Sequence, residues 1–222
     1  MNPILNIDTS LETASVCIAE QGKTLELLKN EEQKDHAAWL HVAIQQLLAN
    51  QGMTAAQLAG VAVSIGPGSY TGLRVGLASA KGLCYALGIP LLTVNTLEMM
   101  ALAVKEEAEE LICPLIDARR MEVFTALYDK ILREIISPKA LLIDENSFAD
   151  TLTTRKILFC GNGRKKLEAL ISAERAQFTE TQADATHLAQ LSYNHYSTKN
   201  FANLVLLEPL YIKEFYSPKQ IG

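Results

Sequence analysis

The stretch that decides the fold runs from Val61 to Thr96 and reads VAVSIGPGSYTGLRVGLASAKGLCYALGIPLLTVNT. Residues 61–65 form a short apolar run with the length and β-branched content of a buried strand. A Gly-Pro-Gly turn follows at 66–68, because glycine permits backbone angles that other residues avoid. Apolar residues then recur at helical spacing over 71–87, and a second apolar run occupies 91–94. The stretch therefore predicts a right-handed parallel strand–helix–strand crossover.

The helix of this crossover carries a stripe of small side chains. Gly72, Gly76, Ala80 and Cys84 follow one another at intervals of four, so one helix face is nearly bare backbone. Each glycine in a helix interior costs about 1 kcal/mol relative to alanine, which indicates a packing reason for the stripe. The turn before the helix, with Arg74 one turn in, predicts an anion site at the helix N-terminus. A purely structural glycine turn is the alternative.

Composition limits the function classes. The chain has 222 residues, 49% apolar and 20% charged, with a net charge of −5. An acidic balance argues against a strong nucleic-acid binder acting alone. The N-terminus lacks the pattern of a signal peptide, and no apolar run approaches a membrane span. Four scattered cysteines without a CxxC pair predict buried thiols in a cytoplasmic protein, with no metal and no disulfide.

The N-terminal segment predicts three short antiparallel strands at about 4–7, 15–19 and 24–28, with Asp8 at the end of the first. A helix capped by Asp35 is expected over 36–50. Another is expected from Leu97 to about Glu110. The first half thus reads β-β-β-α-β-α-β-α.

The second half repeats this opening. CPLIDARRMEVFTALYDKILREII, from Cys113, matches the N-terminal pattern and places Asp117 where the first copy has Asp8. A strand at 156–160, a Gly-Asn-Gly turn, two helices at 164–173 and 186–196, and an irregular exposed tail at 210–222 complete the prediction. We expect an N-terminal lobe at residues 1–110 and a reduced C-terminal lobe at 111–222.

Two copies of a β-β-β lobe, each with an aspartate closing its first strand, are the ground plan of actin, Hsp70 and sugar kinases. The fold class is therefore predicted as α/β, a two-lobed actin-like ATPase (ASKHA, ribonuclease-H-like) fold. Asp8 and Asp117 are expected to face a nucleotide and its metal across the cleft; alternatively, each bonds only its own turn. A two-metal hydrolase would need more carboxylates. His36 and His41 lie five residues apart, which does not fit a helical zinc pair.

Several segments together resemble the TsaB family, also called YeaZ: IDTS near the N-terminus, GPGSYTGLRVGLASAKGLCYALGIPL, VNTLEMMA, PLIDARRMEVF and EPLYIKE. The resemblance covers nearly the whole chain. It implies a part in making threonylcarbamoyladenosine (t6A) beside the anticodon of tRNAs. TsaB proteins look like inactive paralogues of the catalytic subunit TsaD, so the resemblance implies a non-catalytic scaffold. Where TsaD carries its HxxxH metal motif, this chain has His36-Ala-Ala-Trp-Leu-His41.

The resemblance also implies partners: TsaD through the N-lobe helices, the ATPase TsaE, tRNA only through the complex, and a homodimer when alone. No resident cofactor or metal is expected, with ATP or ADP a candidate ligand of the complex. The implied vestigial nucleotide site comprises Asp8, Thr9, Ser10, Asp117, Gly161 and Gly163. The expected partner interface comprises His36, Trp39, Leu40, Ala43, Leu47, Tyr70, Gly72, Arg74, Val75, Gly76, Ser79 and Ala80. Two alternatives stay open: these helix residues face the chain's own sheet, or the chain is an ATPase or carbamoyl transferase using Asp8 and Asp117.

Overall fold

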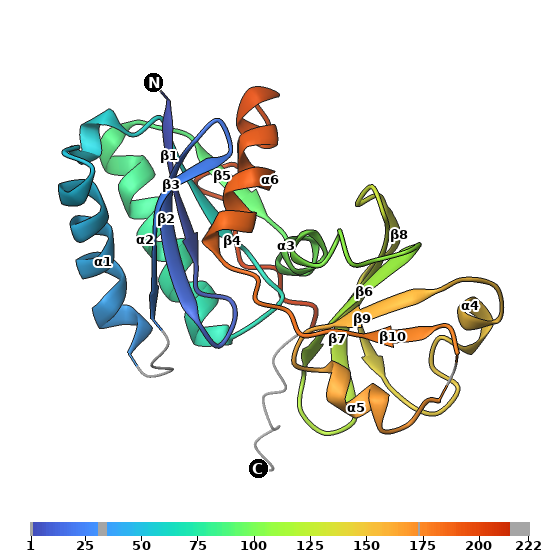
Figure 1. Cartoon of the computed structure of the whole chain (residues 1–222). Helices are drawn as coiled ribbons and strands as arrows, with labels where there is room; N and C mark the ends of the chain where they lie inside the picture. The colour runs from blue at the N-terminus through green and yellow to red at the C-terminus, as the bar shows by residue number, and fades with distance from the viewer. Residues whose placement is uncertain (1, 31–34, 173, 214–222) are drawn as a thin grey trace, which may run out of the picture.

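The computed structural model describes residues 2–30, 35–172 and 174–213, and two five-stranded sheets organise them (Figure 1). The first sheet has the order β3-β2-β1-β4-β5. Its strands are β1 (Pro3–Asp8), β2 (Ala14–Glu20), β3 (Lys23–Asn30), β4 (Gly60–Ser64) and β5 (Leu91–Val94). β1, β2 and β3 pair antiparallel, whereas β4 and β5 continue the sheet in parallel. The predicted meander and parallel crossover are both confirmed.

Helices cover both faces of this first sheet (Figure 1). On one face lie α1 (His36–Asn50) and α2 (Tyr70–Leu87), whose apolar side chains pack on alternate residues of the strands, such as Leu5 and Ile7. α1 begins where the sequence predicts, because the Asp35 carboxylate accepts a hydrogen bond from the Ala38 amide. A short 3₁₀ turn, η1 (Ala55–Gln57), leads into β4.

The second sheet reproduces the first in reduced form. Its order is β10-β9-β6-β7-β8, with the antiparallel trio β6 (Leu111–Asp117), β7 (Glu122–Asp129) and β8 (Glu134–Leu142). Parallel to β6 runs β9 (Ile157–Cys160), followed by β10 (Ala176–Phe178). The helices of this lobe, α4 (Ala149–Thr154) and α5 (Arg164–Glu168), are short. The internal repeat is confirmed, although α5 ends before the predicted residue 173.

One helix joins the lobes. α3 (Thr96–Ala103) lies between the sheets (Figure 1) and contributes Leu97, Met99 and Met100 to a core that includes residues of both. The prediction that this helix continues to Glu110 is wrong. Val104 and Ala108 are both buried, and the chain reaches them through tight turns, such as Glu107 N to Val104 O at 3.0 Å, before it enters β6.

The C-terminal part of the chain returns to the first lobe, so the predicted boundary of 111–222 is wrong at its end. α6 (Ala185–Ser197) packs on β1 to β5, on the face opposite α1 and α2. Backbone amides of Ala202 and Leu210 then donate to Leu91 O and Ile65 O, at 2.9 and 2.8 Å. The tail is therefore held on the first lobe up to Tyr211, whereas Lys213 pairs with Glu122 of the second lobe. The rest of the predicted irregular tail lies outside the described residues. No helix in the described ranges is long and apolar enough to span a membrane.

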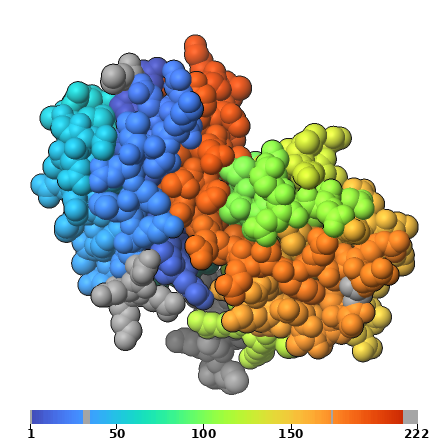
Figure 2. Space-filling model, viewed as in Figure 1, coloured from blue at the N-terminus to red at the C-terminus, as the bar shows by residue number. Residues whose placement is uncertain are grey.

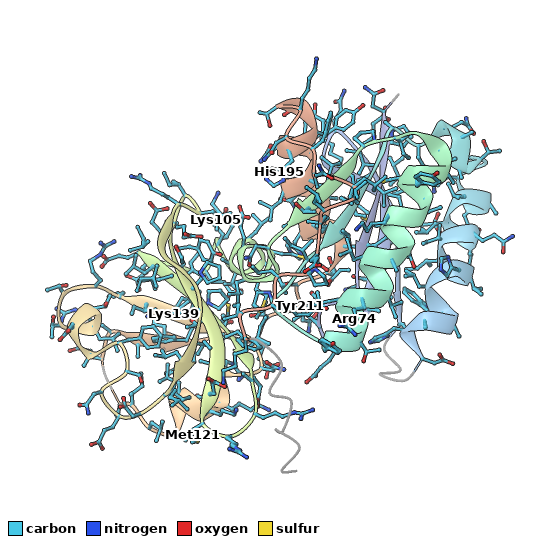
Figure 3. The ribbon with its side chains drawn as sticks, turned by 180° about the vertical axis from the view of Figure 1, so that it is seen from behind. Arg74, Lys105, Met121, Lys139, His195 and Tyr211 are labelled. Atoms are coloured by element: carbon cyan, nitrogen blue, oxygen red, sulfur yellow. The ribbon has the colours of Figure 1, made fainter. Side chains whose placement is uncertain are left out.

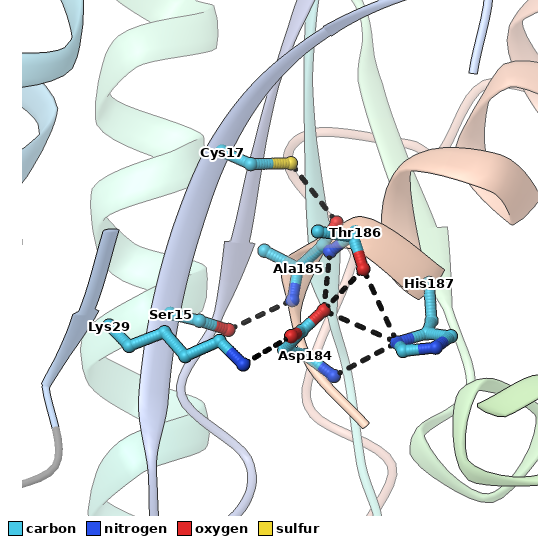
Figure 4. A network of polar contacts seen from close by, with 7 residues as sticks. All are labelled: Ser15, Cys17, Lys29, Asp184, Ala185, Thr186 and His187. Atoms are coloured by element: carbon cyan, nitrogen blue, oxygen red, sulfur yellow. Dashed lines mark hydrogen bonds and ion pairs between the residues drawn. The ribbon is translucent and has the colours of Figure 1, made fainter. Parts of the chain in front are cut away.

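Polar contacts fix the start of α6 on the sheet (Figure 4). The Asp184 carboxylate caps the helix at Thr186 N and pairs with Lys29 at 2.6 Å. Ala185 N donates to Ser15 Oγ at 2.9 Å, and the Cys17 thiol donates to Ala185 O. These groups cannot be found from helix periodicity, because they join strands and a helix that lie at opposite ends of the sequence.

Candidate functional site

A cleft of about 1070 Å³ lies where the two lobes meet. The lobes stand as separate masses around this junction in Figure 2. The walls come from five segments and two single residues. The segments are 10–12, the start of α1, the glycine turn with the start of α2, the end of β6 with its turn, and 210–213, and the single residues are Phe124 and Asn162. Asp117 lines the cleft and Asp8 does not. Only half of the predicted pair of facing aspartates is therefore present.

Asp8 is sealed beneath its own loop. It is fully buried, and its Oδ1 accepts from Ser10 N, Ser10 Oγ and Ser64 Oγ at 3.0, 2.6 and 2.6 Å. Its Oδ2 is buried without a hydrogen-bond partner among the described residues. Burial raises the pKa of this carboxyl group, although the hydrogen bonds from Ser10 and Ser64 oppose the shift. In this structure Asp8 is buried and does not line the cleft, so it does not face Asp117 across it.

The stripe of small side chains on α2 explains why the loop after β1 is buried together with Asp8. A Cβ at Gly72 or Gly76 would collide with Thr9, on its carbonyl oxygen and Oγ1 respectively. The Thr9 hydroxyl donates to Gly72 O at 2.7 Å, and Ser69 N donates to Ser10 O at 2.8 Å. The stripe thus lets α2 approach the end of β1. Thr9 and Ser10 are buried as a result. The expectation that this glycine face is open to a partner is wrong, because it packs against the chain's own first strand and loop.

Asp117 has the opposite environment. It is exposed, and its Oδ1 accepts from Lys166 Nζ and Arg119 N, both at 2.6 Å. Partial burial raises its pKa, but the Lys166 ammonium and the amide hydrogen bond outweigh that effect and lower it. Asn162 links the lobes here, since its side chain accepts from Asp117 N at 2.8 Å and donates to Glu12 at 3.2 Å.

The predicted glycines of the second lobe have a packing role. Gly161 has a positive φ of 91°, and a Cβ there would meet Leu115 O and Met100. Gly163 donates its amide to Leu115 O at 2.9 Å. Gly161 borders a second hollow of about 390 Å³ with Lys29 and Asp184, and not the main cleft. Within the described residues, no three His, Cys, Asp or Glu side chains are grouped to hold a metal ion.

Half of the expected interface is closed by the chain's own core. Leu40, Ala43, Leu47, Gly72, Gly76 and Ala80 are buried, mostly against the first sheet. The expectation that these six side chains contact a partner is wrong for this fold, because they are buried inside the chain. His36, Trp39, Tyr70, Val75 and Ser79 are partly exposed, and Arg74 is exposed.

The outward face of α1 and α2 contains residues that the sequence did not single out. Val42 is 63% exposed and Tyr85 is 83% exposed, with Ala78 and Gly82 also exposed on α2. Gly82 has no heavy atom near its would-be Cβ, so nothing inside the described chain accounts for a glycine in mid-helix. The sequence did contain an indication of this exposed surface, namely a third glycine on α2 that does not follow the four-residue spacing of the buried stripe. We call Val42, Ala78, Gly82 and Tyr85 the outer helix face.

Arg74 does not serve the predicted anion site. Its Nε donates to Tyr211 Oη at 2.9 Å, and its guanidinium lies 3.9 Å from the centre of the Tyr70 ring. Figure 3 shows Arg74 and Tyr211 next to each other at the junction of the lobes. The hydrogen bond that Arg74 donates to Tyr211 holds the pKa of this arginine above its usual range. This arginine fastens the segment that follows α6 to the start of α2.

Comparison with known proteins agrees with this geometry. Residues 30–214 match the family model of TsaD, tRNA N6-adenosine threonylcarbamoyltransferase. The chain is 32% identical to TsaB of Bacillus subtilis, over 72% of this chain and 70% of that protein. It is 29% identical to TsaB of Haemophilus influenzae, over 95% and 83% respectively.

Solved structures agree with the sequence matches. A Pseudomonas aeruginosa structure described as similar to peptidase YEAZ superposes with a TM-score of 0.85 at 25% identity, covering 96% of this chain and all of that one. The doubled sheets and interlobe cleft define an α/β protein with the actin-like ATPase fold. Within that class, the chain belongs to the TsaB (YeaZ) branch of the TsaD-related family.

Proposed function

We propose that this protein is a non-catalytic partner of TsaD in the t6A modification of tRNA. The burial of Asp8 carries the proposal, because an actin-like ATPase needs its first aspartate at the nucleotide and its metal. Here that carboxylate is used to tie Ser10 to Ser64. The names of the relatives, tRNA threonylcarbamoyladenosine biosynthesis protein TsaB, supply the pathway.

TsaD binds, in this proposal, to the outer helix face together with the exposed parts of the expected interface. Ser79 and His41 connect the two helices at 3.2 Å, so the face is a single surface. Its small residues allow the close approach of another helix, and Tyr85 supplies a large side chain for a pocket on the partner. Without TsaD, two copies pair through the same face. TsaE joins the complex, and the protein works in the cytoplasm.

Co-purification with TsaD tests the contact. Gly82→Leu is expected to abolish co-purification and t6A formation, because a bulky side chain holds the helices apart. Ala149→Leu is the matched control, since it adds a comparable side chain to an exposed position on α4 in the second lobe. Retention of TsaD by Gly82→Leu would show that the partner binds elsewhere.

A stand-alone ATPase or carbamoyl transferase is the competing function. It predicts metal-dependent ATP turnover by the purified chain, lost on Asp8→Asn. We expect no such turnover from the wild-type chain.

A further inference from the structure

The turn between β6 and β7 holds two arginines in an unfavourable backbone conformation. Arg119 and Arg120 have φ angles of 70° and 48°, the left-handed region that glycine and asparagine adopt most readily. The turn is fixed by Arg119 N to Asp117 Oδ1 at 2.6 Å and by Ala118 N to Glu122 O at 3.1 Å. Strained backbone of this kind concentrates at functional sites. Met121, the next residue, lies at the end of the second lobe (Figure 3).

The side chains of the same two arginines have no partner among the residues that the structure describes. The other arginines of the described chain, Arg74, Arg133, Arg155, Arg164 and Arg175, each donate to an acceptor in the protein. Within the described ranges, the side chains of Arg119 and Arg120 have no hydrogen bond or ion pair, and both residues are exposed. Their nearest acids in sequence are already neutralised: Lys166 pairs with Asp117 at 2.6 Å, and Lys213 pairs with Glu122 at 2.5 Å. The turn therefore keeps two surplus positive charges on a chain of net charge −5.

The location of the turn indicates the kind of ligand. Arg119 lines the interlobe cleft together with Tyr211, which is 38% exposed although one side of its ring lies near Tyr70. A planar guanidinium binds phosphate oxygens in pairs, and aromatic rings stack on the unpaired bases of single-stranded RNA. An acidic protein segment would use the arginines but not the rings.

We propose that the Arg119–Arg120 turn binds the phosphodiester backbone of an RNA strand. This inference rests on the proposed function for the identity of the RNA, and it goes beyond the expectation that this chain meets tRNA only through the complex. Arg119 at the cleft and Arg120 beside it in the turn contact neighbouring phosphates, and the half-exposed ring of Tyr211 accepts a base beside them.

The test measures binding of a fluorescent, unmodified tRNA transcript to the full chain, alone and with TsaD, at several salt concentrations. Arg119→Gly with Arg120→Gly removes both guanidinium groups and relieves the backbone strain, so folding is retained. We expect at least a tenfold loss of affinity. The slope of log affinity against log salt should fall by about 1.5 to 2, the value for two lost phosphate contacts. Arg119→Lys with Arg120→Lys should keep most of the slope and lose only a few-fold in affinity.

Arg133→Gln is the matched control, since Arg133 is exposed in the same lobe but already paired with Asp129. Its RNA affinity should equal that of the wild type. Unchanged affinity and salt slope in the double glycine variant, or no salt-dependent RNA binding by the wild type, would overturn the inference. So would loss of TsaD binding with RNA binding intact, which would assign the turn to a protein partner. A failure of the proposed function would give a different result: the wild-type chain would not co-purify with TsaD.

Discussion

At the scale of single residues, Asp8 shows how the environment of one side chain depends on a distant element of the fold. The sequence places Asp8 at the end of the first strand, and the structure confirms that position. Whether the carboxylate is open or sealed depends on α2, which lies far along the chain and approaches through Gly68 and Gly72. Sequence reasoning therefore found the residue but could not find its environment.

Substitution of Asp8 by asparagine should alter the pH dependence of stability in a definite direction. Burial raises the folded-state pKa of Asp8, so the folded protein binds more protons than the unfolded chain between pH ~4 and the raised value. Stability from this group is complete below pH ~4 and is lost as the pH rises. Asp8→Asn cannot titrate. The difference in unfolding free energy, variant minus wild type, should thus increase from pH 4.5 to pH 8.

Urea unfolding across that pH range measures the difference. Glu145 is exposed and serves as a control position, where Glu145→Gln should give a difference that does not change with pH. A pH-independent difference for Asp8→Asn as well would mean that the carboxyl group has an ordinary pKa and is in contact with solvent.

At the scale of secondary-structure elements, α2 has two small faces with different roles. The spacing of Gly72, Gly76 and Ala80 predicted a close approach correctly, but periodicity does not say whether the neighbour is the chain's own sheet or another protein. Burial answers that question for the stripe. Gly82 on the outer helix face is the position for which no neighbour exists in the described chain.

Alanine at Gly72 and at Gly82 should therefore have opposite effects on stability. Gly72→Ala forces a methyl group into the Thr9 carbonyl, and overpacking of this kind costs about 1–3 kcal/mol or more. Gly82→Ala adds a methyl group in open space and should stabilise the isolated chain by about 0.5–1 kcal/mol, through helix propensity. Denaturant unfolding of both variants checks the pair. Equal destabilisation would mean that Gly82 is also packed against the protein.

The start of α6 gives a prediction at acid pH. Burial tends to raise the pKa of Asp184, but hydrogen bonds from His187, Lys29 and Thr186 outweigh it and hold the pKa well below its usual range. Stability from this carboxylate is therefore present above pH ~4 and is lost as the pH falls below it. Asp184→Asn should lower stability at pH 7 by about 1–2 kcal/mol, the size of a lost cap, and the deficit should shrink toward pH 2.5.

Thermal unfolding of the two proteins at pH 7, 4 and 2.5 measures this deficit. Asp150 is an exposed acid in the first turn of α4, and Asp150→Asn provides a comparison without a buried ion pair. A deficit that stays constant at all three pH values would show that Asp184 is not ionised in the folded protein.

At the scale of the whole molecule, the internal repeat predicted two lobes, and the structure confirms the two sheets. What the repeat could not predict is how they are joined. α3 lies between the sheets, and α6 returns from the second lobe to cover the first. Apolar side chains of both sheets, α3 and α6 meet in one core, so these elements bury one another's apolar faces. The cleft, with its sealed Asp8 and open Asp117, is a product of that assembly and not of any local motif.

The shared core predicts that the lobes unfold together. It contains Ile4 and Leu92 of the first sheet, Met100 of α3, and Ile112 of the second sheet. Leu152 lies outside it, in a core that belongs to the second lobe alone. Leu152→Ala should cost about 2–4 kcal/mol. If the molecule is one cooperative unit, amides of β1 and β4 should lose as much hydrogen-exchange protection as amides of β6 and β9. Loss confined to the second sheet would mean that α3 joins two independently stable lobes, and the cleft between them could then open without unfolding either one.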